Sequence, residues 1–318
     1  MSSRPSPPAL VLLLPATARF AGLALPPPLA KVLGRADRAR HEAGADAQLA
    51  RHVEAVPRRL PAAPLTRLLD AGADDARLSG WLRADPAYIR PDINGARLLA
   101  TGDALQVDRD DVEAFLPALR PLFGDAGFPL DAPVPERWYL RLPGGAKLPA
   151  FASPDDALGD DVFEHDAFDG GAAPEARRWR VLASEAQVTL HNHPRNAIRQ
   201  AAGKPPVNAL WFWGGGSLPD HVICHRPTLY SDDPLLHGIA RAGNVEAMPL
   251  DRFTSFDADA LVDLRGHRDA RGMVERWLLP AATGGHDAVL DFADGVAFSL
   301  QPGQRWRFWR RPLATLAA

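Results

Sequence analysis

The amino-acid sequence predicts an α/β fold with a mostly parallel central sheet, helices on both faces of that sheet and an antiparallel C-terminal edge. Apolar runs alternate with helix-compatible segments through the second half of the chain, as in folds whose parallel strands are joined by helices. Val207–Trp213 is continuously apolar, which is typical of a strand covered on both faces. Asp294-Gly295 separates two further apolar runs and indicates a hairpin, hence antiparallel pairing.

In the first half of the chain we expect residues 1–8 to be disordered and residues 9–142 to form an N-terminal α/β lobe. The apolar run Leu10–Leu14 predicts a central strand, and Leu29–Leu33 predicts a short helical turn after a proline cluster. The charged, alanine-rich stretch Arg35–Arg59 favours helix. Later segments predict a strand and turn at Leu98–Leu105, a helix from Asp108 through Leu122 that Pro117 kinks or breaks, and a half-buried strand at Arg137–Leu142.

Residues 143–176 are rich in proline, glycine and aspartate, and we interpret them as a connector to a C-terminal α/β lobe at 177–318. One continuous domain is the alternative. A helix is expected at Glu175–Leu190, followed by a second helix that begins after His193 and ends at Gly203. The remaining expected elements are strands at Val222–Cys224, Val245–Met248, Ala260–Leu264, Val289–Phe292 and Val296–Leu300 and helices at Pro234–Ala242 and Arg271–Leu279.

Composition narrows the class of protein. The 318 residues are 46% hydrophobic and 24% charged with a net charge of −3, as in ordinary globular proteins. Interspersed charges of both signs argue against nucleic-acid binding, which needs a basic face. No apolar run approaches the roughly 20 residues of a membrane helix, and Ala9–Leu14 is too short for a signal peptide, so we expect no membrane partner and a cytoplasmic location. Cys224 is the single cysteine, which excludes an internal disulfide.

A cluster of polar residues around Val207–Trp213 predicts a site for a small phosphorylated or carboxylate ligand. Arg195 and Arg199 are four apart and share a helix face, and Lys204 follows that helix. Glycines directly after a buried strand let backbone N–H groups approach an anion. The expected ligand-binding residues are His191, His193, Arg195, Asn196, Arg199, Asn208, Gly214, Gly215 and Gly216. The alternative is a solvated cationic helix face beside a tight turn.

The two histidines and two asparagines of this cluster have alternative roles. His191 and His193 could share a metal, but a capping and packing pair is the favoured interpretation. Asn196 and Asn208 are expected to hydrogen-bond the helix junction to the following strand.

Three other sets of residues could carry chemistry. Ser231 beside two aspartates could be a nucleophile, although helix capping explains the same residues. Asp85 and Asp263 could each bind a metal but show no second ligand at a diagnostic spacing. The segment W-R-F-W-R-R at 306–311 could stack on nucleic acid. We favour an amphipathic edge strand there, with aromatics inward and arginines outward.

Five motifs in order resemble a family of proteobacterial regulatory proteins of the Rpf type, named for the regulation of pathogenicity factors. The motifs are W-L-R-A-D-P at 81–86, R-W-Y-L at 137–140, H-N-H-P-R-N-A-I-R at 191–199, P-V-N-A-L-W-F-W-G-G-G at 206–216 and W-R-F-W-R-R at 306–311. The resemblance covers almost the full length of the chain and implies a regulatory role that acts through a ligand or a partner protein.

The central segment also resembles the archaeal type of cofactor-independent phosphoglycerate mutase, and L-L-H-G-I-A-R-A-G at 235–243 is similar to a helix that follows in those enzymes. The resemblance implies an alkaline-phosphatase-like α/β core, in which two metals and a serine nucleophile transfer a phosphoryl group. Here the first strand, L-V-L-L-L-P-A-T-A, lacks the family's aspartate-glycine motif, and Arg195 replaces the usual valine. The family's C-terminal metal motif has no clear counterpart, since H-R-D at 267–269 and H-D at 286–287 stand alone.

These observations predict a non-catalytic regulatory relative of the mutases, with no catalytic residue and no metal or other cofactor. One alternative is a metal-dependent phosphoglycerate mutase or phosphatase that uses Mn²⁺ or Zn²⁺. The other is a pure protein-interaction module.

Overall fold

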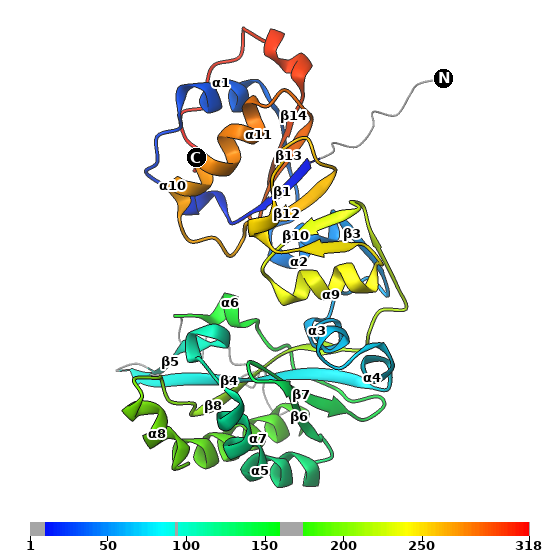
Figure 1. The fold of residues 1–318 in the computed structure, drawn as a ribbon, viewed down its shortest axis with the longest axis vertical. Coiled ribbons are helices and arrows are strands. Elements are labelled where there is room, and N and C mark those ends of the chain that lie inside the picture. The colour runs from blue at the N-terminus through cyan, green and yellow to red at the C-terminus, as the bar shows by residue number, and fades with distance from the viewer. Residues whose placement is uncertain (1–9, 93–94, 160–173, 318) are drawn as a thin grey trace. The chain divides into compact units, whose positions relative to one another are not determined.

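A computed structural model describes residues 10–92, 95–159 and 174–317 (Figure 1). The expected disorder of residues 1–8 lies outside this range. The chain forms two compact units: Met1–Leu60 with Pro219–Ala318, called unit 1 here, and Pro61–Leu218, called unit 2. The division therefore differs from the predicted one, because the connector proposed at 143–176 lies within unit 2. In the described ranges, no helix combines the length and apolarity that crossing a bilayer requires.

Unit 1 is built on a seven-stranded sheet that is mostly parallel, as predicted. From one edge to the other its strands are β11 (Glu246–Met248), β10 (Thr228–Tyr230), β12 (Ala260–Asp263), β1 (Leu10–Leu14), β13 (Ala288–Phe292), β14 (Val296–Leu300) and β2 (Asp37–Arg40). The first five are parallel, and β14 and β2 continue the sheet in antiparallel register. All five residues of β1 are buried, which confirms its central position.

The helices of unit 1 pack beside this sheet. They are α1 (Pro27–Arg35), α2 (Ala45–Ala50), α9 (Pro234–Ala242), α10 (Ala270–Met273) and α11 (Leu279–Thr283), with a π-helical turn at Val274–Leu278 and 3-10 helices at Thr17–Phe20, Leu250–Arg252 and Pro302–Trp306. Leu10, Leu12 and Leu14 point to the same side of β1 and share a core with α1, α10 and α11. A separate two-stranded ribbon pairs β3 (Val53–Val56) with β9 (His221–Cys224).

Two predicted elements of unit 1 were wrong. The stretch Arg35–Arg59, for which the sequence favoured helix, contains β2, α2 and β3. The segment Trp306–Arg311 is not an edge strand, because β2 forms that edge of the sheet and residues 306–311 follow a 3-10 helix. Its aromatic side chains are exposed rather than inward.

Unit 2 has a sheet in which every strand pair is antiparallel. Its strands are β5 (Gly95–Thr101), β4 (Gly80–Asp92), β7 (Arg137–Leu142) and β6 (Leu130–Val134) in that order, and β8 (Ala209–Gly216) also pairs with β4. The apolar run Val207–Trp213 was therefore correctly predicted as a buried strand, but it is not part of a parallel sheet. Ala209–Phe212 are buried because helices cover this sheet too.

The helices of unit 2 lie on both faces of its sheet (Figure 1). They are α3 (Ala62–Asp70), α4 (Ala73–Arg77), α5 (Arg109–Asp125), α6 (Pro154–Ala157), α7 (Pro174–His191) and α8 (Arg195–Ala201). On β4, Leu82 and Ala84 join the core of α5 and α7, whereas Trp81 packs toward α3. The predicted helix after Asp108 is confirmed, and Pro117 does not break it.

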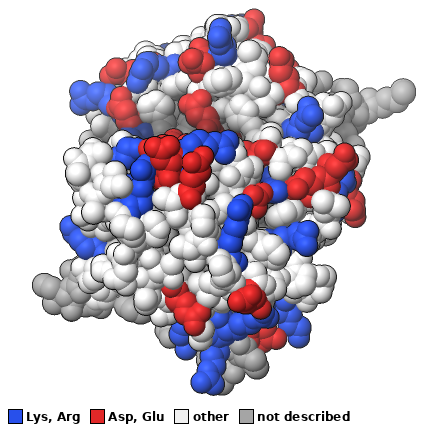
Figure 2. Space-filling view, turned by 60° about the horizontal axis from the view of Figure 1, so that its bottom comes forward, with Lys and Arg blue, Asp and Glu red and all other residues white. Residues whose placement is uncertain are grey.

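Charged residues of both signs are interspersed on the face of the molecule shown in Figure 2. This pattern agrees with a net charge of −3 shared among many residues of each sign. The described part of that face therefore lacks the continuous basic surface that general nucleic-acid binding requires.

Candidate functional site

The predicted ligand cluster of unit 2 meets the N-terminus of α5. Asp108 caps this helix, since its Oδ1 accepts a hydrogen bond from the Asp111 N–H at 2.9 Å. Asp111 Oδ2 in turn accepts from the Asp108 N–H at 3.1 Å, which completes a capping box. The Asp111 side chain is fully buried. A buried carboxylate is stable only when cations and donors surround it.

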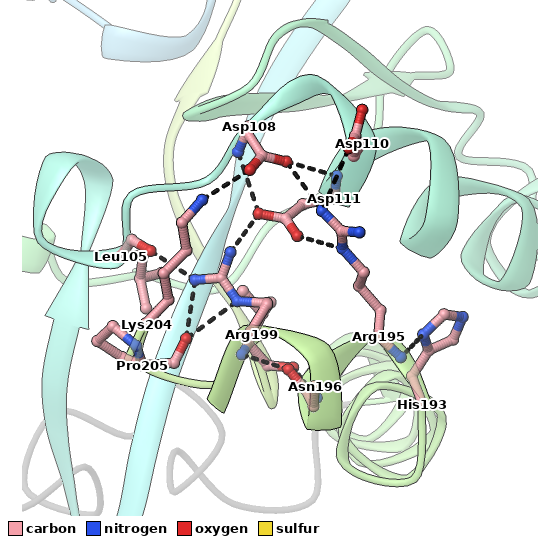
Figure 3. A network of polar contacts seen from close by, with 11 residues as sticks. Leu105, Asp108, Asp110, Asp111, His193, Arg195, Asn196, Arg199, Lys204 and Pro205 are labelled. Atoms are coloured by element: carbon pink, nitrogen blue, oxygen red, sulfur yellow. Dashed lines mark hydrogen bonds and ion pairs between the residues drawn. The ribbon is translucent and has the colours of Figure 1, made fainter. Parts of the chain in front are cut away.

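Two arginines of α8 supply that charge (Figure 3). Arg199 is 1% exposed; its guanidinium pairs with Asp111 Oδ2 and also donates to the carbonyl oxygens of Leu105 and Pro205. Arg195 donates from Nε to Asp111 Oδ1 at 2.7 Å and from Nη2 to Asp108 Oδ1 at 3.2 Å. The two guanidinium groups thus clamp one carboxylate between them.

Lys204 completes the network. Its Nζ donates to Asp108 Oδ2 at 2.6 Å, and this hydrogen bond is the main reason that the pKa of Asp108 falls to about 2. Asp110 lies 3.8 Å from Arg195 Nη2. Three cationic side chains therefore face three carboxylates, and the network is close to neutral. We call Asp108, Asp110, Asp111, Arg195, Arg199 and Lys204 the α5–α8 ion network.

Both asparagines bond backbone groups; Asn196 does so at the helix junction, as expected, whereas Asn208 bonds β4. Asn196 donates to the carbonyl oxygens of Leu190 and Val207 at 2.8 and 2.9 Å and accepts from the Val207 N–H at 2.8 Å. It therefore joins the end of α7 to the start of the following strand. Asn208 makes a similar pair of bonds with the backbone of Ile89, at 2.9 and 2.7 Å.

The two histidines differ in their surroundings. His193 Nδ1 accepts a hydrogen bond from the Arg195 N–H at 3.2 Å. The centre of its ring lies 4.8 Å from that of Phe115, and burial lowers the pKa of His193. These contacts agree with the favoured capping and packing role. His191 is exposed at the end of α7. Neither belongs to a group of three or more metal-binding side chains in the part of the chain that the structure describes.

The glycine triplet faces other parts of the protein. A Cβ on Gly214, whose φ is +64°, would lie 2.7 Å from Ala62 Cβ, and a Cβ on Gly216 would lie 2.8 Å from Pro61 Cβ. A Cβ on Gly215 would lie 2.4 Å from the Leu148 side chain. The glycines thus let β8 approach the start of α3 and neighbouring side chains closely. This packing accounts for them without a ligand.

The predicted residues therefore come together only in part. Arg195, Arg199 and Asn196 lie in one region, but their polar atoms bind groups of the same chain. The group that the guanidinium groups of Arg195 and Arg199 both bind is an internal carboxylate, Asp111. The sequence-based search missed Asp108 and Asp111 because they lie more than 80 residues before their partners.

A second polar region lies at the carboxyl ends of the parallel strands of unit 1, where open α/β sheets usually bind ligands. Asp263, at the end of β12, is 6% exposed. Arg265 donates to its two oxygens from Nε and Nη2 at 2.7 and 3.0 Å, and Ser231 Oγ donates to it at 3.1 Å. Ser231 also accepts from the Asp233 N–H, and Asp233 caps α9. The capping interpretation of this segment is thus confirmed.

A second carboxylate at this edge is paired in the same way. Asp291 of β13 is 1% exposed and accepts from Arg51 Nε and Nη2 at 2.9 and 2.6 Å, while His52 Nε2 lies 2.6 Å away. Burial raises the pKa of Asp291, but the hydrogen bonds and the charges of His52 and Arg51 together lower it by more. Asp294 follows β13 and accepts a hydrogen bond from the Thr17 hydroxyl. The sequence analysis did not propose Asp291 as a site residue. Its position near the end of a predicted strand was the available signal.

These carboxylates do not fit a two-metal site. Each oxygen of Asp263 and Asp291 already accepts from a guanidinium, a hydroxyl or an imidazole. The described residues contain no group of three or more His, Cys, Asp or Glu arranged to hold a metal ion. Asp85 in unit 2 does not fit a metal site either, because its two oxygens accept hydrogen bonds from Arg83, Trp213 and the Trp138 N–H.

Comparisons with known proteins return few relatives. No family model matches the chain, so the resemblance to Rpf-type proteins stays a prediction. A probable 2,3-bisphosphoglycerate-independent phosphoglycerate mutase from Geobacter sulfurreducens is 28% identical over 108 residues. This match spans 32% of the present chain and only 26% of that relative.

Two solved structures align with most of this chain. A cofactor-independent phosphoglycerate mutase from Thermoplasma acidophilum has 16% sequence identity and a TM-score of 0.40, with 93% of this chain and 90% of that one covered. A protein from Pyrococcus horikoshii has 13% identity and a TM-score of 0.44, with 92% and 87% covered.

Proposed function

We propose that this chain is a non-catalytic regulatory protein related to cofactor-independent phosphoglycerate mutase, and that it acts by binding another molecule. The sequence similarity to the Geobacter sulfurreducens protein supports the relationship. The absence of catalysis is supported by two ion pairs at the end of the unit 1 sheet where the parallel strands terminate. There the carboxylates of Asp263 and Asp291 are bound by arginines.

A two-metal phosphoryl transfer needs carboxylates whose lone pairs are free to bind the ions. A bidentate arginine uses the same lone pairs and supplies a fixed positive charge. For a metal to bind Asp291, Arg51 would have to leave a site where the carboxylate is 1% exposed. Removing one partner from such a buried pair is costly. Ser231, the nearest candidate nucleophile, is engaged with Asp263 and with the α9 cap.

The α5–α8 ion network bears on how the protein binds its target. Arg195, Arg199 and Lys204 are satisfied by carboxylates of their own unit, so an external phosphate would have to displace Asp108 or Asp111. This arrangement argues against a small anion at that place, and we propose a protein partner instead. The small phosphorylated or carboxylate ligand is the second candidate, supported by the two guanidinium groups gathered on one helix.

A ligand titration distinguishes these candidates. We expect 3-phosphoglycerate at millimolar concentration to leave the melting temperature unchanged. If it bound the folded protein at about 100 times its Kd, the free energy of unfolding would rise by about 2.7 kcal/mol. A rise that Arg195→Ala abolishes would establish the small-ligand mode and refute the internal role given to the network.

A turnover assay tests the absence of catalysis. Purified protein is incubated with 3-phosphoglycerate and Mn²⁺, and formation of 2-phosphoglycerate is followed. The proposal predicts no interconversion above that of the same mixture without protein. The alternative, a metal-dependent mutase or phosphatase, is favoured by the name of the Geobacter sulfurreducens relative. It predicts turnover that a chelator abolishes.

A further inference from the structure

The segment Trp306–Arg311 carries an exposed aromatic cluster that the proposed function does not use. Trp306, Phe308 and Trp309 are 66%, 77% and 69% exposed. Large aromatic side chains are usually buried, because removing their surface from water is favourable. Three within four residues, all exposed, therefore indicate a surface that another molecule covers.

The base of this segment is held firmly to unit 1. Arg307 pairs with Asp37 and donates to the Arg35 carbonyl at 3.1 Å, while Arg310 donates to the Ala36 carbonyl at 2.7 Å. Arg35 in turn donates to the Arg305 carbonyl at 2.7 Å. The side chains of Arg307 and Arg310 thus point toward residues 35–37, Arg305 and Arg311 are exposed, and the rings point outward, opposite to the sequence-based expectation. The aromatic side chains are held outward by a structured base.

The aromatic segment and the segment that packs against its base carry an excess of positive charge. Residues 27–40 and 302–313, which pack together, contain eight Lys or Arg and one acidic residue, Asp37. Their net charge is +7, in a chain whose total is −3. The basic residues are Lys31, Arg35, Arg38, Arg40, Arg305, Arg307, Arg310 and Arg311. A local excess of this size, against the sign of the whole chain, selects an anionic partner.

The geometry of the rings distinguishes between anionic partners. Phe308 and Trp309 meet edge to face at 79°, and the Arg305 guanidinium lies 5.1 Å from the centre of the Trp306 ring. A single-stranded nucleic acid would need open ring faces in series, which this arrangement does not present. Among the described residues of 27–40 and 302–313, no other large hydrophobic side chain is exposed. A broad apolar face for a protein partner is therefore also missing there.

We propose that Trp306, Phe308, Trp309 and the surrounding arginines form a docking surface for an anionic lipid bilayer. Tryptophan and phenylalanine insert at the boundary between headgroups and acyl chains, and neighbouring arginines bind the acidic headgroups. The surface holds unit 1 at the membrane interface without crossing it. This inference is independent of the regulatory function proposed above.

Vesicle flotation of the full chain tests the proposal. The probes are vesicles of equal parts phosphatidylglycerol and phosphatidylcholine, and vesicles of phosphatidylcholine alone. We expect the chain to float with the anionic vesicles at low salt and to be released when the ionic strength reaches about 1 M, where the Debye length is about 3 Å. Binding to neutral vesicles is expected to be at least about tenfold weaker.

Variants assign this binding to the segment. Replacing Trp306, Phe308 and Trp309 with alanine should lower the partition coefficient at least about tenfold, since most of the inserted apolar area is lost. Each of Arg305→Gln and Arg311→Gln should lower it about fivefold. The matched control replaces Leu78, Val188 and Ile198 with alanine. These residues of unit 2 are 73%, 60% and 58% exposed, and the change should leave binding within about twofold.

Three results would overturn the proposal. The first is the absence of binding to anionic vesicles at low salt. The second is equal binding by the triple aromatic variant, whose melting temperature confirms that it folds. The third is binding of single-stranded oligouridine, but of no vesicle, which would assign the surface to nucleic acid.

Discussion

Asp111 is the residue on which the packing of α8 against α5 depends. Its carboxylate is fully buried and accepts hydrogen bonds from two guanidinium groups and one backbone N–H. Such a charge is tolerated only while its partners remain, since an unpaired ion in the protein interior loses its hydration without compensation. Arg199 is the more important partner, because it is itself 1% exposed and also binds two backbone carbonyl oxygens.

The first prediction follows from this pair. Arg199→Ala leaves Asp111 with one cation and should lower the free energy of unfolding by about 3–5 kcal/mol. Arg195→Ala is the matched control on the same helix: its side chain is 18% exposed and Asp111 keeps Arg199, so the loss should be roughly 1.5–2 kcal/mol. Urea denaturation measures both. Equal losses for the two variants would contradict the central position given to Arg199.

The second prediction concerns acid. Lys204 holds the pKa of folded Asp108 at about 2, below the value of about 3.9 in unfolded chains. This contribution to stability is therefore complete above about pH 5 and is lost as the pH falls toward 2. In Lys204→Met, the difference in melting temperature from the wild type should be constant above about pH 5 and shrink below pH 4. A difference that does not change between pH 5 and 2 would exclude the pairing.

At the scale of residues, the sequence could identify the cations of this network but not their partners. Arg195 and Arg199 share a helix face because they are four apart, and the structure confirms this. Which group they face depends on a contact with Asp111, which lies 84 positions before Arg195 and 88 before Arg199, and no local pattern encodes such a contact. The sequence pattern of two arginines that bind a carboxylate of the protein is the same as that of two arginines that bind a ligand.

Among the elements, β8 and α3 show how closely a strand and a helix can approach. Gly214 lies at φ +64°, in a region that residues with a Cβ rarely adopt, and Ala62 occupies the space beside it. The glycine triplet therefore belongs to the packing of β8 against α3.

The third prediction tests this role. Gly214→Ala should lower the free energy of unfolding by about 2–4 kcal/mol, because it combines a left-handed backbone with a clash against Ala62. Gly124→Ala is the control: Gly124 lies in α5 with open space around it, and the change should raise stability by about 0.5–1 kcal/mol. Thermal or urea unfolding of both variants gives the answer. A neutral Gly214→Ala variant would return the triplet to a ligand-binding role.

Element prediction succeeded where local signals were strong. Arg137–Leu142 alternates with period two, and Asp233 and Gly243 flank α9; both elements lie where predicted. Arg35–Arg59 failed because its charged residues resemble an exposed helix, although β2 is a strand only through its pairing with β14. The prediction of an edge strand at 306–311 was wrong for a related reason. Alternation suggested a strand, whereas Arg307 and Arg310 donate to backbone carbonyl oxygens of residues 35 and 36.

For the whole molecule, chain order and compact units do not coincide. Unit 2 is one continuous stretch, Pro61–Leu218, whereas unit 1 joins the two ends of the chain. In unit 1, β1 lies between β12 and β13, both of which come from the C-terminal stretch. The sequence could not reveal this division, because proline- and glycine-rich composition marks loops within a unit as readily as boundaries between units.

The fourth prediction is that residues 61–218 fold without the rest of the chain. They contain every strand partner of their sheet and the core shared by α5, α7 and β8. Circular dichroism and a cooperative thermal transition would establish folding. Residues 1–60 alone should stay unfolded, because β1 then lacks both neighbours. A disordered 61–218 fragment would contradict the assignment of two compact units.

The central proposal for the whole molecule is that Asp263 and Asp291, which are paired with arginines, hold no metal ions. The most direct test is the metal content of protein purified in the presence of Mn²⁺ and Zn²⁺ and then freed of unbound ions, measured by inductively coupled plasma mass spectrometry. The account predicts less than about 0.1 equivalent of either metal per chain. About two equivalents, as two-metal enzymes hold, would contradict it.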